Sequence, residues 1–128
     1  MKKEVMVNFL IEATDGSSVT FMTPGTLIDY EDHKELTFIE ENDAKLETTV
    51  SIYPAHLVIE RTGDLKMKME FKIGQTTYVK MKTNFKFELT MACVTHSLLI
   101  EPNLIDVIYQ TDTDRENNIT HHLRIKFE

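Results

Sequence analysis

Arg61 is the residue of this chain best suited to bind an anion inside the fold. It shares its parity with Leu57 and Ile59, and alternate side chains of a strand point to the same face, so its guanidinium is expected on an apolar, inward face. There it would present a fork of N–H donors to the carboxylate or phosphate of a ligand. The alternatives are an ion pair with an internal acid or escape to solvent at the strand end, because an unpaired buried charge is costly. These alternatives are favoured, since ligand pockets are few per protein.

Two further polar residues share a face with apolar neighbours. Tyr109 has the parity of Ile105 and Val107, and its hydroxyl could meet a ligand or a backbone carbonyl. His121 has the parity of Leu123. It could act as an interior polar contact, as an acid or base, or as a hydrogen-bonded core residue, and the core role is favoured.

Three methionines, Met67, Met69 and Met81, fall on the same inward parity, as does Met91. Flexible thioethers mould to varied apolar ligands, but they fill gaps in a core equally well, and the core role is the expected one. The first three complete the candidate ligand-binding set in the interior, together with Arg61, Tyr109 and His121.

A metal site is not expected, and no cofactor is predicted. Adjacent side chains of a strand point to opposite faces, so His121 and His122 cannot chelate one ion. The other histidines, His33, His56 and His96, lie in separate segments that no metal-ligand spacing unites.

Catalytic motifs are also missing from the sequence. Cys93 and His96 have opposite strand parity, so the histidine is not placed to activate the thiol. The chain contains no Gly-rich phosphate loop, paired-carboxylate motif or Ser/His/Asp signature. We therefore do not expect an enzyme, and catalysis by inward-pointing Arg61, Tyr109 and His121 is kept as a third alternative for which the residues name no reaction.

Charge is distributed unevenly along the chain, whose net charge is −7. Segment 29–47 holds eight acidic residues and two lysines, whereas segment 66–86 holds six lysines and one acid. The six lysines, on the outer face of one hairpin, are Lys66, Lys68, Lys72, Lys80, Lys82 and Lys86. The net negative charge makes nucleic acid an improbable partner, and a solvated face is the favoured interpretation. The opposite charges of the two segments also allow a homodimer.

The elements that must position these residues are strands. Apolar residues alternate with polar ones, mostly lysines, over 65–71 and 79–91, which is typical of strands with one buried face. The expected strands cover 5–11, 19–30 with an interruption at Pro24-Gly25, 34–41, 45–53, 56–62, 65–71, 79–91, 94–101, 104–112 and 119–127. Short connections between many strands predict an all-β fold without substantial helix, a single antiparallel meander closed into a barrel of about 8–10 strands.

The turn around Gly74 must have an odd length. A two-residue turn at Gly74-Gln75 would place inward Met69 opposite outward Lys80, whereas cross-strand partners share a face. A five-residue turn, which places Glu70 opposite Lys80, is favoured over a three-residue turn, because the shorter turn places Lys68 opposite Lys80.

At 128 residues the chain is expected to form one domain, 1–128. It has no apolar run long enough for a transmembrane helix, so membrane insertion is not expected. The start, Met1-Lys2-Lys3, resembles the basic region of a signal peptide, but Glu4, Asn8 and Glu12 interrupt the apolar stretch behind it. A single cysteine, Cys93, agrees with the reducing cytoplasm, which is the expected location.

A series of short motifs, in order and spacing, is shared with a known family. The motifs are Arg61-Thr62-Gly63-Asp64-Leu65-Lys66-Met67, Phe71, Gly74, Tyr78, Thr83-Asn84-Phe85-Lys86, Thr95-His96-Ser97-Leu98 and Tyr109. Through them, roughly residues 58–127 resemble the YwiB-like bacterial family. The resemblance implies a calycin-like β-barrel, related in shape to lipocalins and fatty-acid-binding proteins, without an established function. Many members have Thr-Pro-Tyr-Gly where this chain has Thr83-Asn84-Phe85-Lys86, so that turn is expected to differ.

Two functions from different classes are compatible with these features. The first is a non-enzymatic small-molecule-binding β-barrel for an apolar or amphipathic anion, with the anionic group near Arg61. A barrel of about eight strands is either filled by side chains or holds one small ligand. The connection between the first two strands is too short for the helical lid of fatty-acid-binding proteins. The second function is that of a ligand-free protein-interaction or self-associating module, which uses its charged outer faces.

Overall fold

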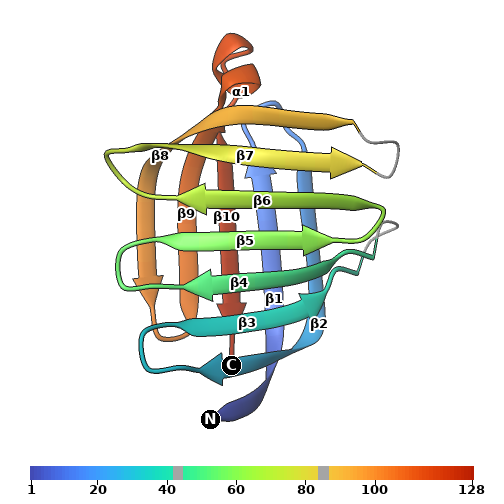
Figure 1. The fold of residues 1–128 in the computed structure, drawn as a ribbon, viewed down its shortest axis with the longest axis vertical. Helices are drawn as coiled ribbons and strands as arrows, with labels where there is room; N and C mark the ends of the chain where they lie inside the picture. The colour runs from blue at the N-terminus through green and yellow to red at the C-terminus, as the bar shows by residue number, and fades with distance from the viewer. Residues whose placement is uncertain (42–44, 84–86) are drawn as a thin grey trace.

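The computed structural model describes residues 1–41, 45–83 and 87–128, which form a closed β-barrel with one short helix (Figure 1). The elements are β1 (Lys2–Ala13), β2 (Ser18–Asp29), β3 (Lys34–Ile39), β4 (Glu47–Ile52), β5 (Leu57–Thr62), β6 (Leu65–Phe71), β7 (Thr76–Thr83), β8 (Glu88–Glu101), β9 (Leu104–Thr111), α1 (Asp112–Glu116) and β10 (His121–Phe127). Asn42 and Asp43, where the sequence Glu41-Asn42-Asp43 also suggests a turn, lie outside the described residues, as do Asn84, Phe85 and Lys86.

The strands follow one another around the barrel in chain order, and β1 closes it by pairing with both β2 and β10. Every neighbouring pair is antiparallel. The predicted all-β meander, closed into a barrel, is thereby confirmed.

The barrel is flattened into two layers whose strands cross steeply (Figure 1). Strands β3 to β7 form the front layer, β1, β9 and β10 lie behind them, and β8 passes from one layer to the other. The register of β8 against β9 shifts between Thr95 and Ser97, and a bulge of this kind bends a strand.

Strand β2 continues through Pro24-Gly25, so the interruption expected there is wrong. Gly25 is buried, and a Cβ atom on it would lie 2.7 Å from Val7 Cγ2 and 3.0 Å from the Thr37 carbonyl oxygen. The glycine is therefore required by the close approach of β1 and β3, and it does not end the strand.

The alternation over 79–91, which we expected to be one strand, belongs to two. β7 ends at Thr83 and β8 begins at Glu88, while Phe87 and Leu89 are exposed at the end of the barrel. Met81 pairs with Leu89, so the two strands of this hairpin keep the same parity. Odd-numbered residues therefore lie on the same face in both strands, and the alternation of apolar and polar residues does not reveal the turn between them.

The β6–β7 hairpin has the predicted odd turn, but the favoured five-residue length is wrong. Lys68 lies opposite Lys80, as the three-residue alternative requires. Gly74 adopts φ +79°, which glycine tolerates at little cost and which permits a compact turn. Glu70 instead pairs with Lys72 on its own side of the hairpin, at 3.4 Å. Backbone geometry thus outweighs the weak repulsion between two exposed lysines.

The short helix α1 occupies part of a segment that we expected to be strand and turn. Thr111 caps it: the Asp114 amide donates to the threonine hydroxyl, and the Thr111 amide donates to the Asp114 carboxylate. Such a capping box begins a helix by satisfying its first amides. Within the described ranges, no helix is long and apolar enough to cross a membrane.

The interior is filled at one end and hollow at the other. The packed end is made by side chains that are almost inaccessible to solvent: Val7, Leu36, Val50, Leu57, Phe71, Ile105, Ile125 and Phe127. At the opposite end, the inward side chains of Ile11, Phe21, Met67, Met81 and Met91 are only partly buried.

Candidate functional site

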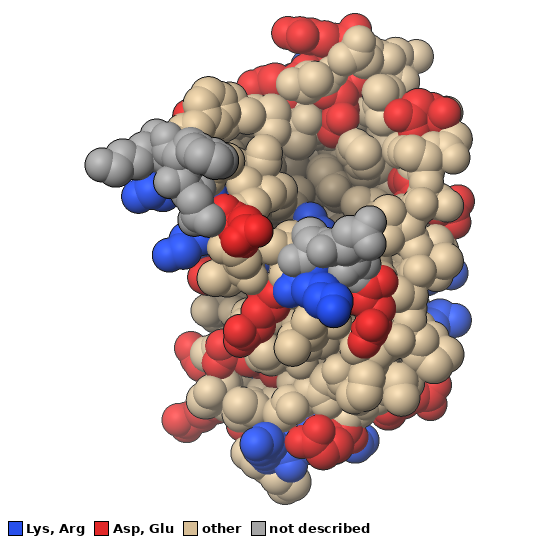
Figure 2. Space-filling view, turned by 90° about the vertical axis from the view of Figure 1, so that its right-hand side faces the viewer, with Lys and Arg blue, Asp and Glu red and all other residues tan. Residues whose placement is uncertain are grey.

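All six candidate ligand-binding residues line one cavity of about 320 Å³ at the hollow end of the barrel. The lining consists of Arg61, Met67, Met69, Val79, Met81, Met91, Tyr109, Thr111, Thr113, Asp114 and His121. Figure 2 looks onto this end and shows the molecule hollowed beneath its acid-rich top.

Antiparallel pairing explains why these residues meet. Strands β5, β7 and β9 end at the hollow end of the barrel, and β6, β8 and β10 begin there. Inward positions near these strand ends therefore face the same space. Helix α1 joins β9 to β10 at this end and contributes Thr113 and Asp114 to the lining.

Arg61 is paired with an internal acid, which is one of the alternatives considered for it. Its Nε donates to Glu40 Oε2 at 2.7 Å, and its Nη2 donates to Glu40 Oε1 at 2.5 Å. The Thr48 hydroxyl also donates to Glu40 Oε2, at 2.5 Å. Glu40 is 1% exposed, while the Arg61 side chain is 27% exposed. The pair neutralises most of the charge that Arg61 would offer to a ligand.

One edge of the guanidinium still faces the cavity. Arg61 Nη1 lies 4.0 Å from Met67 Sδ, a long contact with a weak acceptor. Arg61 therefore retains N–H donors for a better acceptor, such as an oxygen atom of a ligand.

Glu40 was missed as an interior residue, although a signal for it existed. It shares the parity of Leu36 and Phe38 at the end of β3, and both of these are buried. That parity places its carboxylate inside, where a buried acid requires a partner.

Tyr109, His121 and Asp114 form a second polar group on the cavity wall. The rings of Tyr109 and His121 stack with centroids 5.3 Å apart, and His121 Nε2 lies 2.9 Å from Asp114 Oδ1. Burial raises the pKa of Tyr109, and the nearby Cys93 and Asp114 raise it further, whereas Arg61 opposes the shift. The Tyr109 hydroxyl therefore remains protonated throughout the physiological range.

The methionines make up the apolar part of the wall. Met67 lies directly opposite Met81, Met69 lies opposite Val79, and Val79 lies opposite Met91. The Thr113 hydroxyl of α1 reaches Met91 Sδ at 3.6 Å. These flexible side chains can adjust to ligands of different shape.

Cys93 is buried close to this cavity but is not suited to act as a nucleophile. Burial raises the pKa of its thiol to about 11, and the hydrogen bond with Thr77 opposes the shift. The ring of His96 contacts Gln110 instead of the thiol, with Nε2 2.8 Å from Gln110 Oε1.

Two of the histidines that the sequence did not connect come together at the packed end. His33 and His56 stack on opposite faces of Tyr53, with centroid distances of 4.9 and 4.3 Å, and Tyr30 stacks on His33 at 4.9 Å. The intervening ring of Tyr53 keeps the two histidines from sharing an ion. In the parts of the chain that the structure describes, no group of three or more His, Cys, Asp or Glu side chains is placed to hold a metal.

Comparison with known proteins supports the fold and the family. Residues 7–125 match the family model described as "Domain of unknown function (DUF1934)". The chain is 26% identical, over 138 residues, to the uncharacterized beta-barrel protein YwiB of Bacillus subtilis, covering 100% of this chain and 96% of that protein. The crystal structure of ywiB protein from Bacillus subtilis matches with a TM-score of 0.84 and 21% identity, covering 99% of this chain and 92% of that chain. Because the family model spans nearly the whole chain, the protein belongs to the DUF1934 family, and the resemblance to YwiB-like proteins is confirmed.

Proposed function

We propose that this protein is a non-enzymatic barrel that binds one small, mainly apolar ligand through an oxygen-bearing head group. The observation that carries the proposal is the convergence of the six inward residues on one cavity of about 320 Å³, at the low end of the roughly 300–1,000 Å³ that is usual for ligand sites. Almost inaccessible side chains fill the other end of the barrel interior, which favours this end for the ligand.

The arrangement of polar atoms suggests how such a ligand lies. Its apolar part contacts the methionine wall, and its head group accepts a hydrogen bond from Arg61 Nη1, in place of the weak contact with Met67 Sδ. A carboxylate is the anionic head group expected from the sequence. Because Glu40 already balances the charge of Arg61, a neutral hydroxyl or carbonyl oxygen competes with it.

Nothing in this cavity requires a reaction. The Cys93 thiol is protonated near neutral pH, and His121 is held against Asp114. Storage, transport or sensing of the ligand therefore fits the residues better than catalysis does. We place this activity in the cytoplasm, in agreement with a single buried, unpaired cysteine.

Native mass spectrometry of protein purified gently from its own cells, beside a denatured control, tests the proposal first. We expect a discrete additional mass that disappears on denaturation, and its elemental formula identifies the ligand class. A bare monomer would contradict a resident ligand. A bare dimer would point instead to a self-associating module that uses the charged outer faces.

Calorimetric titration with octanoate and with 1-octanol separates the two kinds of head group. Binding of octanoate alone supports an anionic ligand, whereas binding of both supports a neutral acceptor. Met91→Trp fills the cavity from β8 and should abolish either binding. Leu99→Trp changes an exposed residue of the same strand and should preserve it. Equal binding by the two variants would place the probe outside the cavity.

A further inference from the structure

Four lysines form a compact square on the outer face of β6 and β7, which we term the lysine quartet. Lys66 lies directly opposite Lys82, and Lys68 lies directly opposite Lys80. Opposed residues of this kind have Cβ atoms about 5 Å apart, and like charges placed there destabilise a sheet. The quartet therefore works against the stability of the hairpin that carries it.

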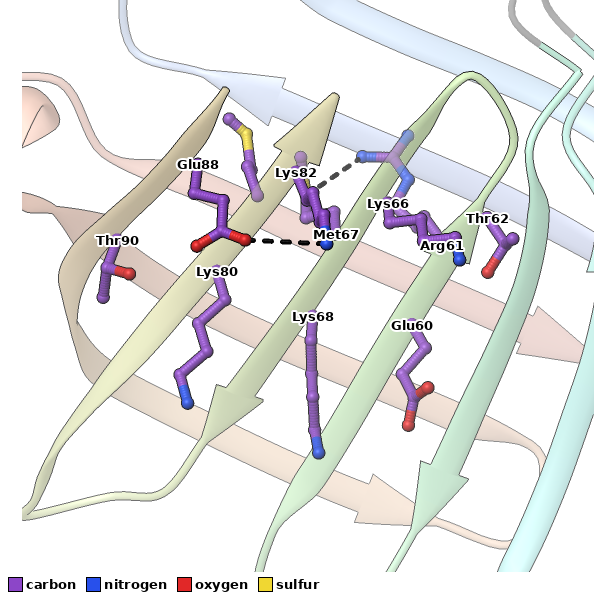
Figure 3. A pocket seen from close by; sticks show the side chains of 11 residues that line it. Glu60, Arg61, Thr62, Lys66, Met67, Lys68, Lys80, Lys82, Glu88 and Thr90 are labelled. Carbon is purple, nitrogen blue, oxygen red and sulfur yellow. Dashed lines mark hydrogen bonds and ion pairs between the residues drawn. The ribbon is translucent and has the colours of Figure 1, made fainter. Parts of the chain in front are cut away.

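Two carboxylates lie beside the quartet, Glu60 directly opposite Lys68 and Glu88 directly opposite Lys82. Lys82 pairs with Glu88 at 3.6 Å, through side chains that are both well exposed. Across residues 1–41, 45–83 and 87–128, Lys66, Lys68 and Lys80 have no carboxylate within 4.0 Å. Figure 3 shows the four side chains rising from neighbouring strands on one face, with Lys68 and Lys80 extended side by side. Positive charge is thus concentrated over a small area.

The flanking strands frame the quartet with an approximate two-fold symmetry. Thr62 and Glu88 continue the row of Lys66 and Lys82, while Glu60 and Thr90 continue the row of Lys68 and Lys80. A two-fold axis through the centre exchanges the two threonines and the two glutamates. These residues line a shallow pocket of about 450 Å³ (Figure 3).

This frame favours a short, multiply charged anion. Ammonium groups are compact cations suited to phosphate oxygens, and two threonine hydroxyls at diagonal corners add donors. The carboxylates at the other corners repel an anion that extends across the strands beyond the quartet. A long nucleic acid is further disfavoured by the net charge of −7.

One aromatic ring adjoins the quartet. Tyr78, which is 55% exposed, lies two residues before Lys80 on the same face of β7. It lines a second pocket, of about 340 Å³, that shares Lys68 and Lys80 with the first. An organic group attached to the phosphates could therefore stack on this ring.

We propose that the lysine quartet binds a di- or triphosphate group on the outer face of the barrel wall, opposite the face that lines the cavity. The group is either inorganic or the phosphate chain of a nucleotide. It lies over the two lysine pairs, within reach of at most one of the two threonines at a time. Bound anion relieves the repulsion that the cross-strand lysine pairs impose on the hairpin.

Calorimetric titration with inorganic tripolyphosphate and with ATP, at an ionic strength of about 20 mM, tests this site. We expect one tripolyphosphate per chain, and an affinity at least about tenfold weaker in Lys68→Gln/Lys80→Gln. Lys3→Gln/Lys126→Gln is the control, because it removes the same charge from exposed lysines of β1 and β10. The quartet variant should also unfold at a slightly higher temperature without ligand, which separates lost binding from lost folding.

A second variant identifies the source of the phosphate. If Tyr78→Ala weakens ATP binding and leaves tripolyphosphate binding unchanged, the site is one for nucleotides; if it changes neither, the site takes the inorganic anion. The proposal is overturned if neither anion binds, or if the control loses as much affinity as the quartet variant. It is also overturned if a long oligouridylate binds more tightly than tripolyphosphate and depends on the same lysines.

Discussion

Among single residues, Arg61 should affect stability mainly through Glu40. The carboxylate is 1% exposed and accepts two hydrogen bonds from the guanidinium. Removing one partner of a buried ion pair costs about 3–5 kcal/mol, because the charge that stays buried loses that attraction and its hydrogen bonds. We therefore expect Arg61→Leu to lower the free energy of unfolding by about 3 kcal/mol, measured by urea denaturation.

The double variant Arg61→Leu/Glu40→Leu is the matched control for this effect. Replacing both members of a buried pair by apolar side chains is often close to neutral, so most of the stability should return. Glu40→Leu alone should cost less than Arg61→Leu, because the side chain of Arg61 is 27% exposed and can be solvated. An Arg61→Leu variant as stable as the native protein would show that the pair contributes nothing.

Cys93 should make the protein less stable in alkaline solution. Burial raises the pKa of its thiol in the folded state to about 11, from an ordinary value of 9.0. Between these pH values the folded chain holds a proton that the unfolded chain loses, so stability is complete below about pH 9 and falls as pH rises to about 11. The full effect is about 3 kcal/mol, since the shift is about two pKa units and one unit corresponds to about 1.4 kcal/mol.

Denaturation midpoints measured at a series of alkaline pH values check this expectation. Cys93→Ala should flatten the decline between pH 9 and 11. Burial also raises the pKa of Tyr109, so ionisation of this hydroxyl adds to the loss of stability at higher pH. Tyr109→Phe removes that contribution and so measures it. An identical decline in Cys93→Ala and in the native protein would rule out the thiol as its source.

At the scale of elements, the capping of α1 should matter for both stability and binding. Thr111→Val keeps the shape of a buried side chain but removes the hydroxyl that accepts from the Asp114 amide. Loss of such a cap costs about 0.5–2 kcal/mol. Because Asp114 holds His121 at the cavity wall, octanoate binding should weaken as well. Thr20→Val, at an exposed position of β2, is the control. It should change neither the stability, measured by thermal denaturation, nor the binding of octanoate.

Elements also explain how much of the structure could be predicted from the sequence. The parity of a strand is a local property, so the alternation placed the six candidate residues on the inward face before their neighbours were known. The partnership of Arg61 with Glu40 depends on the register of β3, β4 and β5, which no local pattern contains. The β6–β7 register depends on the backbone of one turn at Gly74. By contrast, the Thr111–Asp114 capping box was a local signal that could have revealed α1.

For the molecule as a whole, the uneven filling of the barrel predicts uneven protection of its amides. Val50, between Leu36 and Ile59, lies in the packed end, whereas Met81, between Met67 and Leu89, borders the cavity. Fewer buried contacts allow local opening at lower free energy, so amides around Met81 should exchange before global unfolding and those around Val50 only with it. Hydrogen exchange in low urea measures the free energy of local opening at both ends. Octanoate should raise it only for the amides around Met81. Equal opening energies at the two ends would mean that the cavity does not weaken the barrel.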